Sequence, residues 1–165
     1  MTGEPRLIVH ADDFGLSEAV NRAVVAAHEG GIVTSTSIMA GGDAFEHAVA
    51  LARSHPSLDV GVHLTLTEQR PVAANVPSLV DAEGKLAPHA TELARRRALG
   101  KISMSDVRRE LEAQICRVLD GGLMPTHLDG HQHVHVLPGV AQVVLELARA
   151  HGIAAVRYPA ERVRG

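Results

Sequence analysis

The chain has 165 residues and a formal net charge of −3, and 45% of its residues are hydrophobic. This size suits one domain with a single core, so we treat residues 1–165 as one unit. Charges of both signs are interspersed without long runs, which argues against a nucleic-acid partner. No stretch approaches the length of a membrane span and no apolar leader opens the sequence, so we expect a cytoplasmic protein.

Short apolar runs alternate with amphipathic segments, which is typical of βαβ units and a parallel sheet. A first strand at residues 7–11 is followed by a helix that begins at Ser17, a good N-cap. A second strand at 34–40 precedes a helix for which Asp43 and Glu46 have the spacing of a capping box. The third predicted strand covers 59–64 and places His63 near its end.

The pattern breaks between about residues 67 and 101, where Pro and Gly punctuate a polar stretch. This stretch is too long for an ordinary connection, so we expect a lid or an insertion. Regular structure resumes with a helix capped by Ser105, a strand at 125–129, a helix with Pro138 in its first turn, and a strand at 154–158. Five parallel strands fit either an open sheet or part of a (β/α) barrel.

Metal-competent side chains follow three of the predicted strands. They are the Asp12-Asp13 pair, His63, and four histidines with an aspartate between His127 and His135. Because the carboxyl ends of parallel strands share one face, these groups are expected to converge. Two imidazoles and one carboxylate would leave open positions on a divalent cation. The second carboxylate could then accept a proton from a water molecule.

Each segment also has a structural interpretation. An Asp pair is often a capping turn, and a single histidine such as His63 is more often a hydrogen-bonded core residue. The run from His127 to His135 has no packing explanation of this kind, and it carries the metal-site prediction. The other histidines belong to no such group and are interpreted as structural or solvent-facing: His10, His28, His47, His55, His89 and His151.

Several segments strongly resemble one family. Ala11 to Gly15 (ADDFG), Gly30 to Ser37, Gly61 to His63, the Val76-Pro77 region and Thr126 to His135 (THLDGHQHVH) are similar to the YdjC-like carbohydrate deacetylases. That family includes chitooligosaccharide deacetylases and the hopanoid-biosynthesis HpnK group. The resemblance runs from about Leu7 to Tyr158. It implies an irregular (β/α) barrel and metal-assisted hydrolysis of an N-acetyl group on an amino sugar.

The resemblance also implies roles by position. Metal ligands would be Asp13, His63 and His131, and Asp12 would be the general base. Substrate contacts are expected from three residues, Phe14, His127 and Asp129. Of these, His127 could instead bind the metal as an alternate ligand, or hydrogen-bond to a ligand and orient it.

A general acid must protonate the leaving amine, and here the chain departs from the family. Family members are longer, whereas this sequence ends just after the fifth predicted strand, so we expect the C-terminal part of the barrel to be missing. The acid is then His133 or His135, or another chain completes the site, or catalysis is impaired. An open barrel edge would also favour a homo-oligomer.

The expected cofactor is one divalent metal ion, magnesium or zinc, with manganese and cobalt also compatible. The expected partner is a small amino-sugar substrate. Two other functions remain open from the sequence alone. One is a different metal-dependent hydrolase, such as a phosphoesterase, and the other is a metal-binding fragment or interaction module without turnover.

Overall fold

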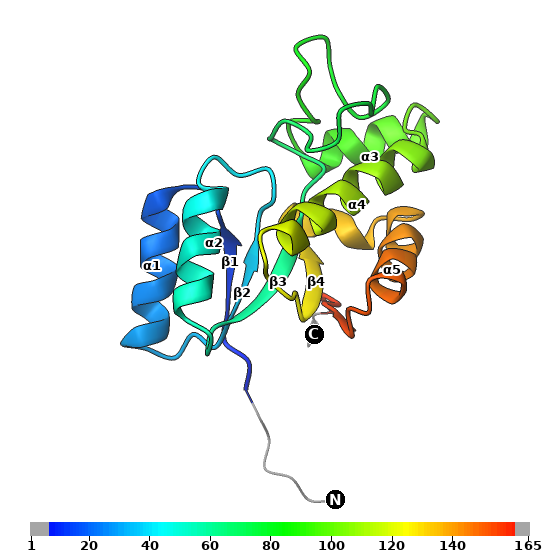
Figure 1. Ribbon diagram of the computed structural model, residues 1–165. Helices are drawn as coiled ribbons and strands as arrows, with labels where there is room; N and C mark the ends of the chain where they lie inside the picture. The colour runs from blue at the N-terminus through cyan, green and yellow to red at the C-terminus, as the bar shows by residue number, and fades with distance from the viewer. Residues whose placement is uncertain (1–6, 161–165) are drawn as a thin grey trace, which may run out of the picture.

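The computed structural model describes residues 7–160 and shows an α/β fold (Figure 1). A single sheet contains five strands in the order β1-β2-β3-β4-β5, and every neighbouring pair is parallel. The strands are β1 (His10–Phe14), β2 (Ser35–Ile38), β3 (Asp59–Leu64), β4 (His127–Gly130) and β5 (Ala155–Val156). Sequential parallel strands joined by helices form a partial barrel, which confirms the predicted fold class.

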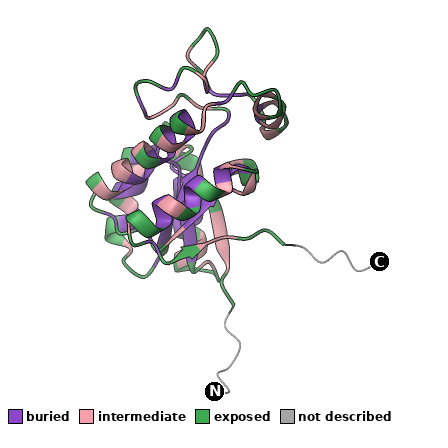
Figure 2. Cartoon of the chain, turned by 90° about the vertical axis from the view of Figure 1, so that its right-hand side faces the viewer, coloured by how far each residue is buried: buried purple, intermediate pink, exposed green. Residues whose placement is uncertain are grey.

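Helices connect the strands and cover one face of the sheet. They are α1 (Glu18–Glu29), α2 (Phe45–Ser54), α3 (Ala90–Ala98), α4 (Met104–Asp120), the 3₁₀ helix η1 (His131–Val136) and α5 (Val140–Ala150). The covered face is apolar, and Ile38, Val62 and Leu128 are fully buried in the core. In Figure 2 the strands are largely buried, whereas the tip of the segment before α3 is exposed. None of the helices among residues 7–160 is long and apolar enough to cross a membrane.

The opposite face of the sheet is polar. Side chains alternate between the two faces of a strand, so every second residue of the parallel strands shares this inner face. Its members include His10, Ser37, His63, His127 and Asp129, which contact one another across β1 to β4. The sheet thus packs its helices against one face and gathers polar side chains on the other.

The segment between β3 and α4 is anchored by buried acids of α4. Glu110 is fully buried and accepts hydrogen bonds from the backbone N–H groups of Val72 and Ala73, at 3.0 and 2.9 Å. Asp106 accepts from the N–H of Ser78 at 2.9 Å. A buried carboxylate needs such partners, and here it fixes the path of a segment with little regular structure.

Several predicted boundaries were wrong. The first strand begins at His10 rather than residue 7, so Asp12 and Asp13 lie within it. Helix α2 has Ala44 at its N-cap and no side-chain cap, so the predicted capping box does not form. Helix α3 was not expected within residues 67–101.

Two helix starts also differ from the prediction. Helix α4 is preceded by Ser103 at the N-cap position, and Ser105 lies in its first turn. Helix α5 begins at Val140, so Pro138 precedes it instead of lying in its first turn. The N-cap at Ser17 was predicted correctly, because its side chain accepts a hydrogen bond from the N–H of Val20.

Candidate metal centre

The site begins with an irregularity in β1. The pairing of β1 with β2 shifts between Ala11 and Phe14, and Asp13 has a φ of 64°. In a regular strand, Asp12 and Asp13 would face opposite sides of the sheet. The bulge instead turns both carboxylates toward the inner end of the sheet. A non-glycine residue in this left-handed region is strained, and such strain is typical of functional positions.

Three potential ligands meet at this point, from β1, the end of β3 and the start of η1. Oδ1 of Asp13 lies 3.2 Å from Nε2 of His63 and 2.9 Å from Nδ1 of His131. Donor atoms at right angles on a cation, with bonds of about 2.1 Å, lie about 3 Å apart. The three atoms therefore fit a divalent cation, and the group is partly to fully buried.

The other ring nitrogen of His63 contacts a second carboxylate. Nδ1 of His63 donates to Oδ1 of Asp129 at 2.7 Å, and Ser37 donates to Oδ2 of Asp129 at 3.0 Å. Burial alone would lower the pKa of His63, but the hydrogen bonds to Asp129 and Asp13 outweigh it and raise that pKa to about 9. Hydrogen bonds from His131 and His63 in turn hold the pKa of Asp13 far below its usual range.

Asp12 is the more exposed of the two neighbouring carboxylates, with a side chain that is 44% accessible. Its Oδ1 lies 3.2 Å from Nε2 of His10 and 2.9 Å from Nη1 of Arg157, which follows β5. The hydrogen bond with His10 is the main cause that lowers the pKa of Asp12, with further contributions from His63 and Arg157. Asp12 is therefore ionised, oriented and open to a ligand.

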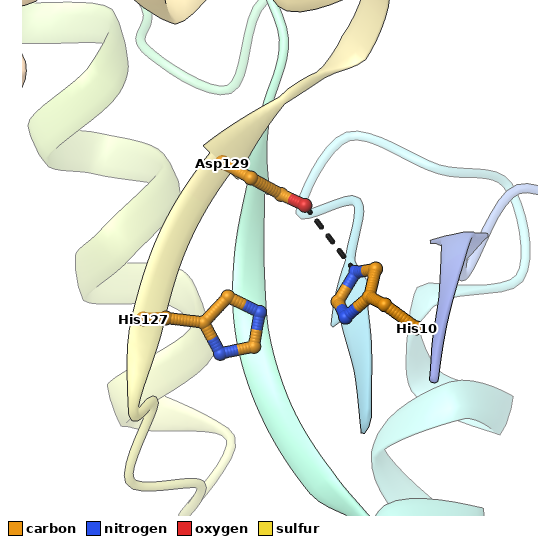
Figure 3. Close-up of side chains that lie close together, drawn as sticks. All are labelled: His10, His127 and Asp129. Carbon is orange, nitrogen blue, oxygen red and sulfur yellow. Dashed lines mark ion pairs between the residues drawn. The ribbon is translucent and has the colours of Figure 1, made fainter. Parts of the chain in front are cut away.

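A second group of polar side chains lies deeper on the inner face, shown in Figure 3. Nε2 of His10 is 3.3 Å from Oδ2 of Asp129, and the rings of His10 and His127 meet edge to face at 5.2 Å. A cavity of about 430 Å³ adjoins them and is lined in part by Thr126, His127 and Arg157. Gly61 is required here, because a Cβ atom would overlap the His127 ring. This histidine remains a predicted substrate contact.

The histidines at the end of the run behave differently from one another. Gln132 and His133 have positive φ values of 50° and 56°, so η1 contains a kink, and the rings of His133 and His135 meet edge to face at 6.1 Å. His133 is exposed. His135 is only 1% exposed, and its Nε2 donates to the carbonyl of Arg157 at 2.9 Å. Of the two predicted general acids, His133 is therefore accessible to a ligand, whereas His135 is buried against the backbone.

Two of the predicted substrate contacts, Phe14 and Asp129, are fully buried. Phe14 is 0% exposed and belongs to the hydrophobic core, because the bulge at Asp13 turns its ring to the outer face. Asp129 is 0% exposed, and its carboxylate is occupied by His63, Ser37 and Arg157. Asp129 thus contacts His63, one of the three potential metal ligands.

Sequence reasoning missed three residues of the site. His10 was interpreted as structural or solvent-facing, although its spacing of two from Asp12 on a strand signals a shared face. Arg157 directly follows β5, and its side chain reaches the carboxylates of Asp12 and Asp129. Glu68 lies four residues beyond β3, with Oε2 at 3.0 Å from Nε2 of His131, and no sequence pattern indicated it.

Comparison with known proteins supports this description. Residues 6–165 match the family described as YdjC-like protein. A carbohydrate deacetylase from Brevibacillus brevis is 46% identical over 156 residues, which cover 93% of this chain and 59% of that protein. A chitooligosaccharide deacetylase from Serratia marcescens is 41% identical over 151 residues, which cover 91% of this chain and 58% of that protein.

A solved structure from Enterococcus faecalis V583, whose name refers to cellobiose-phosphate cleavage, superimposes with a TM-score of 0.82 at 34% identity. The match covers 94% of this chain and 59% of that one. The chain therefore spans about three fifths of the length of these relatives. The family resemblance inferred from the sequence is confirmed, and the chain belongs to the YdjC-like protein family.

Proposed function

We propose that this chain carries the metal centre of a hydrolase that removes the N-acetyl group from an acetylated amino sugar. One observation carries the proposal: Asp13, His63 and His131 converge with ligand spacing, and the ionised, accessible carboxylate of Asp12 lies beside them. The names of the relatives from Brevibacillus brevis and Serratia marcescens support the choice of an acetylated sugar.

The ligand set is compatible with several divalent cations. Two imidazole nitrogens and one carboxylate oxygen suit zinc, and they also suit manganese or cobalt. Magnesium fits where water and substrate oxygens complete the coordination. When bound, the cation would polarise the amide carbonyl and lower the pKa of a water molecule.

Asp12 would accept the proton in this reaction. His10 and Arg157 fix its carboxylate from one side, which leaves the second oxygen free to meet a water molecule. Both neighbours also favour the ionised form, so Asp12 would be ready to accept a proton at neutral pH. The negative charge of Asp129 acts to raise the pKa of Asp12, but Asp129 is already paired with His63.

The exposure of His133 supports it as the proton donor. It is exposed and lies two residues from His131, on the kinked part of η1. His135, the other candidate, is buried against the backbone of Arg157. We therefore propose that His133 protonates the leaving amine, unless a group supplied by another chain does so.

Acetate release from N-acetylglucosamine oligomers tests the proposal, with protein loaded with zinc or magnesium. Metal-dependent release that the Asp12→Asn variant lacks, although it still binds metal, would support a deacetylase. Release by Asp12→Asn at the wild-type rate would refute the role of Asp12. Stoichiometric metal binding without release by the wild type would mean a metal-binding chain that does not turn over alone.

A further inference from the structure

Glu68 lies beside the metal centre, on the segment that leaves the end of β3. Its Oε2 accepts a hydrogen bond from Nε2 of His131 at 3.0 Å, and its Oε1 accepts one from Nε2 of Gln132 at 2.6 Å. One carboxylate thus binds two consecutive residues of η1. Neither the Asp-Asp pair nor the histidine run includes it.

The backbone around Glu68 fixes this carboxylate in place. Glu68 has a φ of 66°, and its N–H donates to the carbonyl of Ala87 at 2.8 Å. Gln132, which also has positive φ, accepts a hydrogen bond from the N–H of Ala90 at the start of α3. A non-glycine residue keeps this strained conformation only when its surroundings determine it, and here two strained residues hold each other.

The contacts of His131 distinguish its two ring nitrogens. Nδ1 lies 2.9 Å from Oδ1 of Asp13, on the side where the potential ligands meet, and Nε2 points away to Glu68. His63 shows the opposite arrangement, with Nε2 toward Asp13 and Nδ1 toward Asp129. Each histidine therefore has one nitrogen facing the metal position and a carboxylate on the other nitrogen. This arrangement fixes the tautomer and ring orientation of metal-binding histidines.

We propose that Glu68 is a positioning residue that holds His131 with its proton on Nε2, so that Nδ1 is the metal-binding nitrogen. The inference rests on the proposed metal centre. In this arrangement His63 binds through Nε2 and His131 through Nδ1. The same carboxylate also ties the segment that contains α3 to the metal centre, through Gln132 and Ala90.

Zinc affinity, measured by competition with a chromophoric chelator, tests the role of Glu68. We expect Glu68→Ala to bind zinc about 10- to 100-fold more weakly than the wild type, as for other residues that support a ligand. Glu68→Gln keeps an oxygen that can accept from Nε2, so its affinity should fall much less. Glu83→Gln is the matched control, because it removes one exposed carboxylate from the same segment and should bind zinc like the wild type.

Nitrogen-15 NMR of the histidine rings in the zinc-loaded protein tests the tautomer directly. We expect the His131 proton on Nε2 and the zinc-shifted resonance on Nδ1. A proton on Nδ1, wild-type affinity in Glu68→Ala, or equal losses in the Ala and Gln variants would overturn the proposal. If the wild type binds zinc normally in these cases, the metal centre stands and only the role of Glu68 fails. A wild type that binds no zinc would refute both.

Discussion

Nδ1 of His63 lies 2.7 Å from Oδ1 of Asp129, and both side chains are buried on the inner face of the sheet. The two residues are 66 positions apart in the sequence, but the parallel register of β3 and β4 pairs them directly. The contact leaves Nε2 of His63 facing Asp13. The sheet register thus sets which nitrogen of His63 can bind a metal.

Asp129→Asn should weaken metal binding without removing any ligand. The neutral amide keeps one oxygen that can accept from Nδ1 of His63, but it removes the negative charge from a fully buried contact, so we expect zinc affinity to fall about 10-fold. Isothermal titration of the metal-free protein would measure this. Ser37→Ala is the comparison, since it removes the hydroxyl that contacts Asp129, His63 and His10 but leaves the Asp129 carboxylate, and it should have a smaller effect. An unchanged affinity in Asp129→Asn would show that the contact does not support the ligand.

The stability of the metal-free protein should fall as pH rises above neutral. The pKa of His63 is raised from 6.5 to about 9 in the folded state, so its ion pairs stabilise the protein when His63 is protonated. This contribution is complete below about pH 6.5 and is lost as pH rises through about 9. At about 1.4 kcal/mol per unit of pKa, the loss is on the order of 3 kcal/mol.

Urea unfolding between about pH 6 and pH 10, with a chelator present, would measure how the free energy of unfolding depends on pH. The His63→Gln variant should show a smaller dependence on pH, because the amide does not titrate and other histidines whose pKa values are also raised, such as His10 and His131, still contribute. Bound zinc should also remove most of it, since the metal takes the place of the proton on His63. A wild-type stability that does not change over this range would refute the assignment.

Gly61→Ala should destabilise the protein through a single clash. A Cβ atom at Gly61 would overlap the ring of His127 on the neighbouring strand, and we expect a loss of about 1–3 kcal/mol in the free energy of unfolding. Gly30→Ala is the control, because the nearest atom to its Cβ is a carbonyl oxygen at an ordinary 3.5 Å. Combining Gly61→Ala with His127→Ala should restore part of the loss. Additive effects would mean that the two residues do not clash.

The sequence predicted the parts of the site that depend on regular structure. Alternating strands and helices indicated a parallel sheet, and this placed the Asp12-Asp13 pair, His63 and the run from His127 to His135 at strand ends on one side of the sheet. The choice of Asp13, His63 and His131 within these segments came from the family resemblance. Their convergence follows from topology, so it needs no knowledge of loops. The sequence did not predict Asp129 as the hydrogen-bonded partner of His63. Asp129 was interpreted as a substrate contact, and only the structure shows that it is buried.

The errors arose where the backbone departs from regular geometry. Regular alternation would place Phe14 on the inner face with Asp12, but the bulge at Asp13 reverses the pattern and buries Phe14 in the core. Glu68 depends on a left-handed backbone within an irregular segment, and propensity gives no signal for it. His10 was the avoidable omission, since it shares the strand face of Asp12.

Asp13 itself should show a conflict between stability and metal binding. At a φ of 64°, glycine is free of the strain that an alanine side chain would carry. Both Asp13→Gly and Asp13→Ala remove the carboxylate, so both should lose zinc binding and the ion pairs with His63 and His131. In the metal-free state, however, the Gly variant should be more stable than the Ala variant by about 1 kcal/mol.

Urea unfolding of the metal-free variants would measure this difference, and Asp13→Asn completes the comparison. Asparagine tolerates the left-handed region better than alanine and keeps the shape of the side chain, so its stability should lie closer to that of the Gly variant. Equal stabilities for Gly and Ala would show that the bulge costs nothing at this position. If Asp13→Gly is more stable than Asp13→Ala and binds no zinc, the strained backbone at position 13 serves the metal ligand and not the fold.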